Sequence, residues 1–127
     1  MKNVRRPKYL GLFTLAANMS ITAKVSILHR ISGILLFLSI PFLLFILHRS
    51  LIAPDFYEAL YGFMTNSIIK IAYLLLIWAF TYHSCAGIRF LFLDIDKGVE
   101  IKLAKKTSYL VIFFSTILTI IIGIIIW

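Results

Sequence analysis

Apolar and polar positions along the chain are grouped in long blocks. Three apolar segments, at about residues 26–48, 68–93 and 109–127, are separated by two polar connections. The third segment has no charged residue from Tyr109 to Trp127, and as a helix it would rise about 28 Å, enough to cross a bilayer. The pattern therefore predicts an all-α integral membrane protein with three transmembrane helices, in a single membrane-anchor domain covering residues 1–127.

Polar and turn-forming residues mark the ends of these segments. Either Ser20 or Thr22 is expected to cap the first helix. The first connection runs over residues 50–67, and the second over residues 94–106, where Gly98 is expected to form a turn. No repeat or second domain interrupts this arrangement.

Composition and charge agree with this interpretation and add an orientation. The chain is 61% apolar with a mean hydropathy of +1.00, and 13 Lys and Arg against 5 acidic residues give a net charge of +8. The chain up to Arg30 holds six of these cations, the first connection with its flanks holds two (Arg49 and Lys70), and the second with its flanks holds five (Arg89 through Lys106). Because flanks rich in Lys and Arg stay inside, the N-terminus and second connection are predicted inside, and the first connection and C-terminus outside.

The composition also excludes several classes of function. Basic residues are not interleaved with aromatic ones, so nucleic acid is not expected as a partner. Cys85 is the only cysteine, which excludes an internal disulfide. No nucleophile–base pair, paired carboxylates, phosphate loop or multi-ligand metal spacing occurs, so the isolated chain is not expected to contain a catalytic centre. No removable signal peptide is expected at the basic N-terminus.

One histidine lies deep within the second apolar segment. His83 is followed by four small residues, Ser84 to Gly87, and Gly87 lies one helical turn further along. An ionisable ring inside a membrane segment is costly unless it has a partner. A flat, metal-containing ligand would fit beside this ring, against the helical surface that the small residues leave open. Alternatively, His83 hydrogen-bonds a neighbouring helix, and the small residues only allow close packing.

Four further polar residues are predicted at the inner membrane edge, on the same side as His83. Ser26, His29 and Arg30 have helical spacings of three and four residues, so one helical face can carry all of them. Asp94 ends the second segment on that side. The set suits a ligand with a polar head and an apolar tail, or the acidic side chains of a macrocycle. Alternatively, Arg30 belongs to the usual basic belt at the inner face.

Two motifs occur in order at the inner ends of the first two segments. They read Ser26-Ile-Leu-His29-Arg30-Ile-Ser-Gly33 and His83-x-x-x-Gly87-Ile88-Arg89-x-x-x-x-Asp94. Together they resemble the family of succinate dehydrogenase cytochrome b556 subunits. The leader with Arg6-Pro7 and the three-span layout are also similar to that family, so the resemblance covers nearly the whole chain. Phe90 departs from the pattern, since some relatives carry a second histidine there, which puts a second haem contact from that position in doubt.

The resemblance implies a membrane-anchor subunit of succinate dehydrogenase (respiratory complex II) that helps to pass electrons from succinate to ubiquinone. In this family, two small membrane subunits share a b-type haem and dock an iron–sulfur subunit and a flavoprotein subunit. The resemblance makes His83 the axial ligand of the haem iron and puts His29 and Arg30 near the haem propionates. It also makes Ser26 and Arg30 the ubiquinone-binding residues, and Asp94 matches the carboxylate that ends the second motif. The expected location is a bacterial inner membrane or the mitochondrial inner membrane.

The residues leave two other functions open. The chain could be a haem-free membrane adaptor or transporter subunit, in which His83 only packs between helices. It could also anchor a fumarate reductase, which runs the same redox couple in reverse. A haem spectrum of the purified complex tests the first alternative, and the soluble subunits and the quinone potential decide the second.

Overall fold

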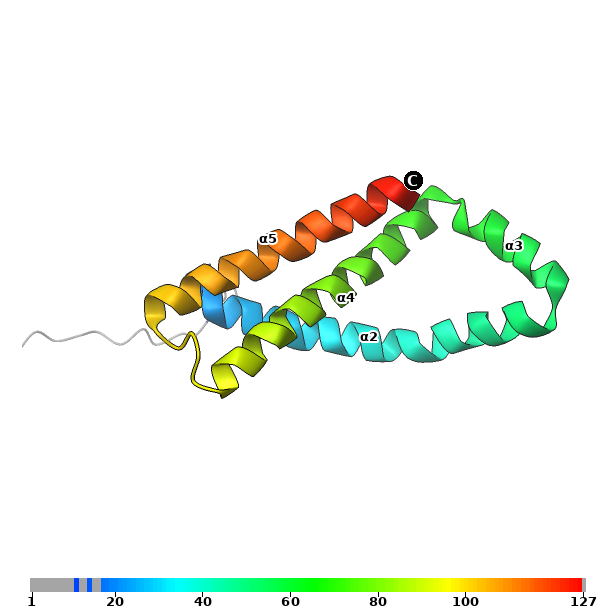
Figure 1. Cartoon of the computed structure of the whole chain (residues 1–127). Coiled ribbons are helices and arrows are strands. Elements are labelled where there is room, and N and C mark those ends of the chain that lie inside the picture. The colour runs from blue at the N-terminus through cyan, green and yellow to red at the C-terminus, as the bar shows by residue number, and fades with distance from the viewer. Residues whose placement is uncertain (1–10, 12–13, 15–16, 127) are drawn as a thin grey trace, which may run out of the picture.

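The computed structural model describes residues 11, 14 and 17–126, and four helices follow one another within that part of the chain. They are α2 (Ile21–Ile52), α3 (Pro54–Met64), α4 (Ser67–Asp94) and α5 (Ile101–Ile126) (Figure 1). The predicted all-α class is confirmed for these residues. The leader motif Arg6-Pro7 and the last residue of the predicted third segment, Trp127, lie outside the described residues.

Three of the helices are long and apolar enough to cross a membrane. They are α2 with 32 residues, α4 with 28 and α5 with 26. At 1.5 Å per residue the shortest is about 39 Å long, which exceeds a hydrocarbon core of about 30 Å. Each predicted segment lies within one of these helices as far as the described residues extend. The helix ends can therefore reach into the head-group layer, where polar side chains are solvated.

Both polar connections contain more helix than the block pattern indicated. The first connection contains α3, whose first turn carries Asp55, a favourable charge for a helix N-terminus. In the second connection α5 already begins at Ile101, so the lysines of residues 102–106 lie in its first turns. Lysine is a good helix former and its long side chain can reach polar surroundings, so the fall in hydropathy does not end the helix. The turn predicted at Gly98 is confirmed by its φ of 85°.

Side-chain caps fix the starts of the first two long helices. The Ser20 hydroxyl accepts a hydrogen bond from the main-chain N–H of Ala23 at 3.3 Å, so Ser20 is the N-cap and Thr22 lies inside α2. Asn66 accepts a hydrogen bond from the N–H of Ile68 at 2.9 Å and caps α4 in the same way. Each cap satisfies one of the main-chain donors that the first helical turn leaves without a partner.

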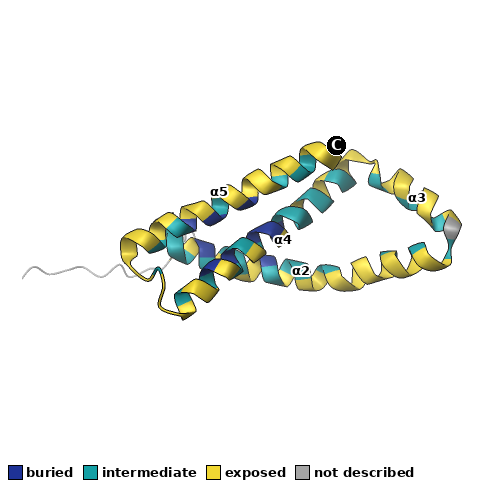
Figure 2. Cartoon of the chain, viewed as in Figure 1, coloured by how far each residue is buried: buried dark blue, intermediate teal, exposed yellow. Residues whose placement is uncertain are grey.

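The helices pack most closely at the end of the bundle where α2 begins, α4 ends and α5 begins (Figures 1 and 2). One cluster of buried apolar side chains is shared by these three helices: Val25, Tyr82, Ala86 and Val111. Tyr82 is fully buried, and its hydroxyl donates to the main-chain carbonyl of Val25 at 3.1 Å. This bond fixes the first half of α2 against the second half of α4, which are the two stretches that hold the candidate site residues.

Most of the remaining apolar surface is exposed (Figure 2). Phe37 on α2 is 72% exposed and Ile125 on α5 is 78% exposed. An exposed apolar surface of this extent is stable against lipid tails or partner helices and unfavourable in water. The distribution of burial therefore supports a membrane protein with a small core of its own.

Candidate functional site

His83 of α4 points towards α2, and its Nδ1 atom contacts two oxygens there. Nδ1 lies 3.1 Å from the main-chain carbonyl oxygen of His29 and 3.2 Å from the hydroxyl oxygen of Ser32. Ser32 in turn donates its hydroxyl proton to the same carbonyl at 2.8 Å. Because a carbonyl oxygen only accepts, Nδ1 must carry the proton, and Ser32 receives a share of that N–H. In the neutral ring the free lone pair is then on Nε2, which makes no hydrogen bond within the described residues.

The position of the His83 ring depends on Gly33. A Cβ atom added at Gly33 would lie 2.9 Å from Cε1 and 3.4 Å from Nδ1 of His83. The first distance is shorter than real Cβ contacts, so any side chain at residue 33 would displace the ring. The glycine therefore lets the imidazole lie directly against the α2 backbone, where the carbonyl of His29 is within reach.

His29 lies beside His83, and its ring has an unsatisfied nitrogen. The two imidazoles are stacked, with centroids 4.1 Å apart and planes inclined by 14°. Phe90 packs on the same histidine, with centroids 5.1 Å apart, so the position that departs from the family pattern still lies at the site. The Nε2 atom of His29 is buried and has no hydrogen-bond partner in the described part of the chain. A buried polar atom without a partner is costly, and a ligand or a second subunit could satisfy it.

Ser26 and Arg30 lie on α2 at the predicted spacing of one helical turn. Ser26 is half-buried and Arg30 is exposed, and neither makes a side-chain hydrogen bond within the described residues. Helical geometry continues their face through His29 to Gly33, which contacts His83. Ser26, Arg30 and His29 therefore occupy one continuous face of α2, and the ring of His83 from α4 packs on that face.

Asp94 is not part of this cluster. It is the last residue of α4 and is exposed, eleven residues after His83, which corresponds to a rise of about 16 Å along the helix. The structure thus brings His29 and His83 together and leaves the carboxylate that ends the second motif at the helix terminus. Within the described residues, no three His, Cys, Asp or Glu side chains converge to hold a metal ion.

Two polar residues near the site escaped the sequence analysis as functional candidates. Ser32 is 3% exposed and contacts His83. It belongs to the first motif, but the sequence did not predict a role for it. Arg89 was counted among the flanking cations, but it is 7% exposed and donates from Nε to the Thr107 hydroxyl at 3.1 Å. The available signal was its spacing. Ala86 comes four residues after Tyr82 and Arg89 three residues after Ala86, so all three lie on one face of α4, and that face is buried.

Comparisons with known proteins match nearly the whole chain. Residues 2–122 match the family described as succinate dehydrogenase/fumarate reductase transmembrane subunit. The chain is 33% identical over 126 residues to a succinate dehydrogenase cytochrome b556 subunit of Coxiella burnetii, covering 98% of this chain and 99% of that protein. It is 37% identical over 106 residues to the protein of the same name in Rickettsia bellii, covering 80% and 79%. It is also similar to a succinate dehydrogenase cytochrome b560 subunit of Reclinomonas americana, with 34% identity over 131 residues and coverage of 97% and 88%.

Proposed function

This chain belongs to the succinate dehydrogenase/fumarate reductase transmembrane subunit family as a membrane cytochrome b subunit of succinate dehydrogenase, and we propose that its share of the haem site is centred on His83. The haem would be of the b type and shared with a second small membrane subunit, because His83 would supply one ligand to the iron and leave the other to a residue of that subunit. When bound, the haem supplies one-electron redox chemistry. The chain alone holds no catalytic centre in this proposal.

The observation that carries the proposal is the contact between Nδ1 of His83 and the main-chain carbonyl oxygen of His29. The hydrogen bond to the His29 carbonyl keeps the proton on Nδ1 and leaves the Nε2 lone pair for iron. Metal-bound histidines commonly donate their other N–H to a carbonyl in this way, which orients the ring and raises its basicity. The stacked His29 ring covers a face of His83, whereas the Nε2 lone pair lies in the plane of the ring and would be left for a ligand. The two contacts are therefore compatible.

His29 and Arg30 are assigned to the neighbourhood of the haem propionates. The buried Nε2 of His29 needs a partner, and a carboxylate of the macrocycle is a suitable acceptor when that nitrogen carries the proton. Arg30 is the next residue along α2 and offers a fixed positive charge at the protein surface. Charge-assisted hydrogen bonds of this kind are stronger than neutral ones, so they would contribute to holding the haem.

Ser26 and Arg30 are assigned to ubiquinone. Both side chains are without hydrogen-bond partners in the described residues, and they lie one turn apart near the start of α2. A quinone carbonyl gains negative charge as it is reduced, and a guanidinium in partly apolar surroundings stabilises that charge more than it would in water. The quinone tail can remain in lipid beside α2, whose outer surface is apolar.

The flanking charges support an orientation for the assembled complex. The N-terminus and the connection between α4 and α5 lie inside, and α3 and the C-terminus lie outside. The iron–sulfur and flavoprotein subunits dock on the inner face, so electrons from succinate arrive on the side that holds Ser26, Arg30 and the histidine pair. The membrane is the inner membrane of a bacterium or of a mitochondrion.

The assignment of His83 is tested with His83→Ala in the purified complex. We expect a lower haem-to-protein ratio and a changed reduced-minus-oxidised spectrum, while the helices still insert and the subunits still assemble. His48→Ala is the matched control, since His48 is exposed near the far end of α2. An unchanged haem ratio and spectrum in the His83 variant would contradict the proposal. A wild-type complex without haem would favour the membrane-adaptor alternative. Quinone reduction need not fall, because electrons can reach quinone directly from the nearest iron–sulfur cluster.

A further inference from the structure

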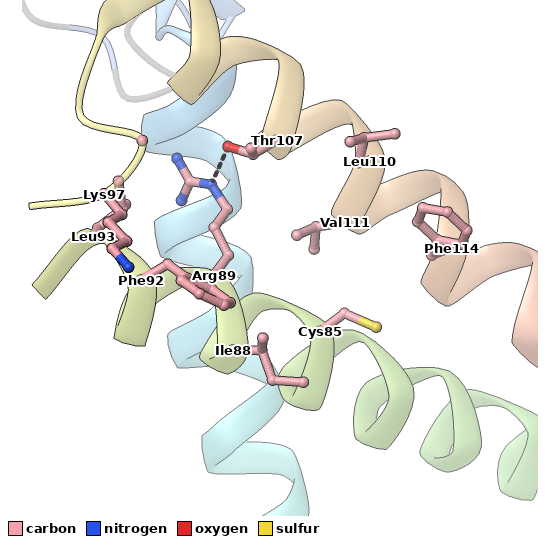
Figure 3. Close-up of a pocket in the computed structure, with 11 residues that line it drawn as sticks. Cys85, Ile88, Arg89, Phe92, Leu93, Lys97, Thr107, Leu110, Val111 and Phe114 are labelled. Carbon is pink, nitrogen blue, oxygen red and sulfur yellow. Dashed lines mark hydrogen bonds between the residues drawn. The ribbon is translucent and has the colours of Figure 1, made fainter. Parts of the chain in front are cut away.

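Two pockets adjoin at the end of the bundle where α4 ends. The first is an apolar groove between α4 and α5 of about 450 Å³, whose side chains include Cys85, Ile88, Phe92, Leu110, Val111 and Phe114 (Figure 3). The second, of about 480 Å³, is more polar and is lined by residues from the starts of α2 and α5, including Ser20, Thr22 and Lys105. Arg89 and Leu93 line both pockets, so the two spaces are neighbours that share these side chains in their walls.

Arg89 is a buried cation whose hydrogen bonds are incomplete. Its Nε donates to the Thr107 hydroxyl at 3.1 Å (Figure 3), and its Nη2 donates to the carbonyl of Ala104 at 3.3 Å. Its Nη1 is buried and has no hydrogen-bond partner in the described part of the chain. The contacts that Arg89 does make are with neutral oxygens and with the ring of Phe90, 5.2 Å from the guanidinium carbon. A buried guanidinium in such surroundings lacks a counter-charge, and an anion at the junction would supply it.

Other groups around the junction reinforce the positive charge. Lys97 lines the apolar groove and Lys105 lines the polar pocket, and none of the residues that line either pocket is acidic. The hydroxyls of Ser20 and Thr22, which lie 2.9 Å apart, add neutral donors at the capped start of α2. Positive charge, hydroxyl donors and a helix N-terminus together favour an anionic group with several oxygens.

We propose that this junction binds an acidic phospholipid, with its phosphate at Arg89 and Lys105 and an acyl chain in the groove between α4 and α5. Arg89 lies five residues before the end of α4, about 7.5 Å along the axis, which suits the boundary between head groups and hydrocarbon. A soluble anion would use only the polar pocket. An amphiphile can use both spaces, and it is favoured because Arg89 and Leu93 line both of them and so place the polar pocket next to the apolar groove.

The lipid site is separate from the haem and quinone assignments. Its residues lie between α4 and α5 and at the start of α2, whereas His83 faces Ser32 and Gly33 on α2. Only the choice of leaflet depends on the proposed orientation. With the connection between α4 and α5 inside, the lipid would come from the inner leaflet. A membrane whose inner leaflet contains anionic lipids would supply the ligand without any soluble factor.

The test compares two adjacent lysines in the assembled complex. Complexes carrying Lys105→Gln or Lys106→Gln are placed in nanodiscs containing phosphatidylglycerol and phosphatidylcholine, and the lipid that stays bound on release is measured by native mass spectrometry. Both lysines are exposed and both changes remove one charge, but only Lys105 lines the pocket. We expect about tenfold less retained phosphatidylglycerol with Lys105→Gln, because a hydrogen bond to a charged group is lost, and no change with Lys106→Gln.

A third variant and a soluble competitor complete the test. Arg89→Lys keeps the charge but loses the planar fork, and we expect it also to reduce retained phosphatidylglycerol. Glycerol 3-phosphate should displace the lipid poorly, because it has no chain to fill the groove. The proposal would be overturned if both glutamine variants retained the same amount of phosphatidylglycerol, whether normal or reduced. It would also be overturned if the complex retained phosphatidylcholine to the same extent as phosphatidylglycerol. Ready displacement by glycerol 3-phosphate would overturn it too, as would a cross-link from Lys105 to a soluble subunit in a complex that retains no lipid.

Discussion

The Nδ1 atom of His83 lies 3.1 Å from the carbonyl oxygen of His29, so a main-chain group favours the tautomer of the half-buried imidazole that carries its proton on Nδ1. A side-chain substitution at residue 29 leaves that carbonyl in place, and the orientation of His83 therefore depends mainly on how α2 and α4 pack. Ser32 adds a second acceptor on the same nitrogen at 3.2 Å. The main-chain and side-chain contacts can be separated by mutation.

Ser32→Ala should weaken haem binding without abolishing it. The His29 carbonyl still holds the Nδ1 proton, but the second acceptor is lost, and loss of such an outer contact typically weakens a metal site by about tenfold. Haem retention during dilution, followed by the Soret absorbance, measures the change. Ser39→Ala is the control. Like Ser32, Ser39 donates to the main-chain carbonyl three residues earlier on the same helix, at a distance of 2.7 Å. Equal effects of the two changes would assign the loss to α2 itself and contradict a role at His83.

Gly33→Ala should displace the His83 ring and destabilise the haem-loaded complex. The added Cβ would lie 2.9 Å from Cε1, and overpacking of this kind typically costs about 1–3 kcal/mol. Haem content and the thermal midpoint of the complex are the measurements. In Gly62→Ala the added Cβ has nothing within 4 Å, so the same change in the interior of α3 should be neutral or stabilise by about 0.5–1 kcal/mol. Normal haem content in the Gly33 variant would show that the ring position is not limiting.

Ser26→Ala and Arg30→Leu should slow quinone reduction driven by succinate. The serine change removes one hydroxyl hydrogen bond, worth about 0.5–1.5 kcal/mol to a neutral acceptor and more as the quinone gains charge. Succinate oxidation with an artificial acceptor that takes electrons from the soluble subunits should persist. The ratio of the two activities, in membranes with matched amounts of complex, is the readout. A parallel fall of both activities would mean that these residues serve assembly, with Arg30 acting as part of the basic belt.

Reporter fusions should place Lys102 inside, and Pro54 and the C-terminus outside. The physical reason is the excess of Lys and Arg in the flanks near the N-terminus and between α4 and α5. Fusions with a reporter active only inside and another active only outside measure each position independently. An inside signal from a fusion after Trp127 would require a different number of spans or the opposite orientation.

The sequence by itself determined the class of protein and the three helices that are long and apolar enough to cross a membrane. Long apolar blocks predict spanning helices because the hydrocarbon core requires every main-chain group to be bonded within the segment, a requirement that each segment meets alone. The paired motifs around His29 and His83 also identified the family, which the comparisons confirm. The start of the first helix and the Gly98 turn were equally local: the cap predicted at Ser20 or Thr22 is Ser20, and the turn is confirmed. Hydropathy did not reveal α3 or the early start of α5, because helix formation continues beyond the apolar core wherever polar residues favour it.

Only the tertiary structure decided which polar residues meet. His29 and His83 are 54 positions apart, and their contact depends on how α2 and α4 cross and rotate, which a pattern of single residues does not specify. The same packing buried Arg89 between helices, although its place near a membrane edge is typical of a solvated cation. It also left Asp94 outside the cluster. Main-chain hydrogen bonding and hydropathy act along one segment, whereas side-chain packing acts between segments, and the site is formed by the second kind of interaction.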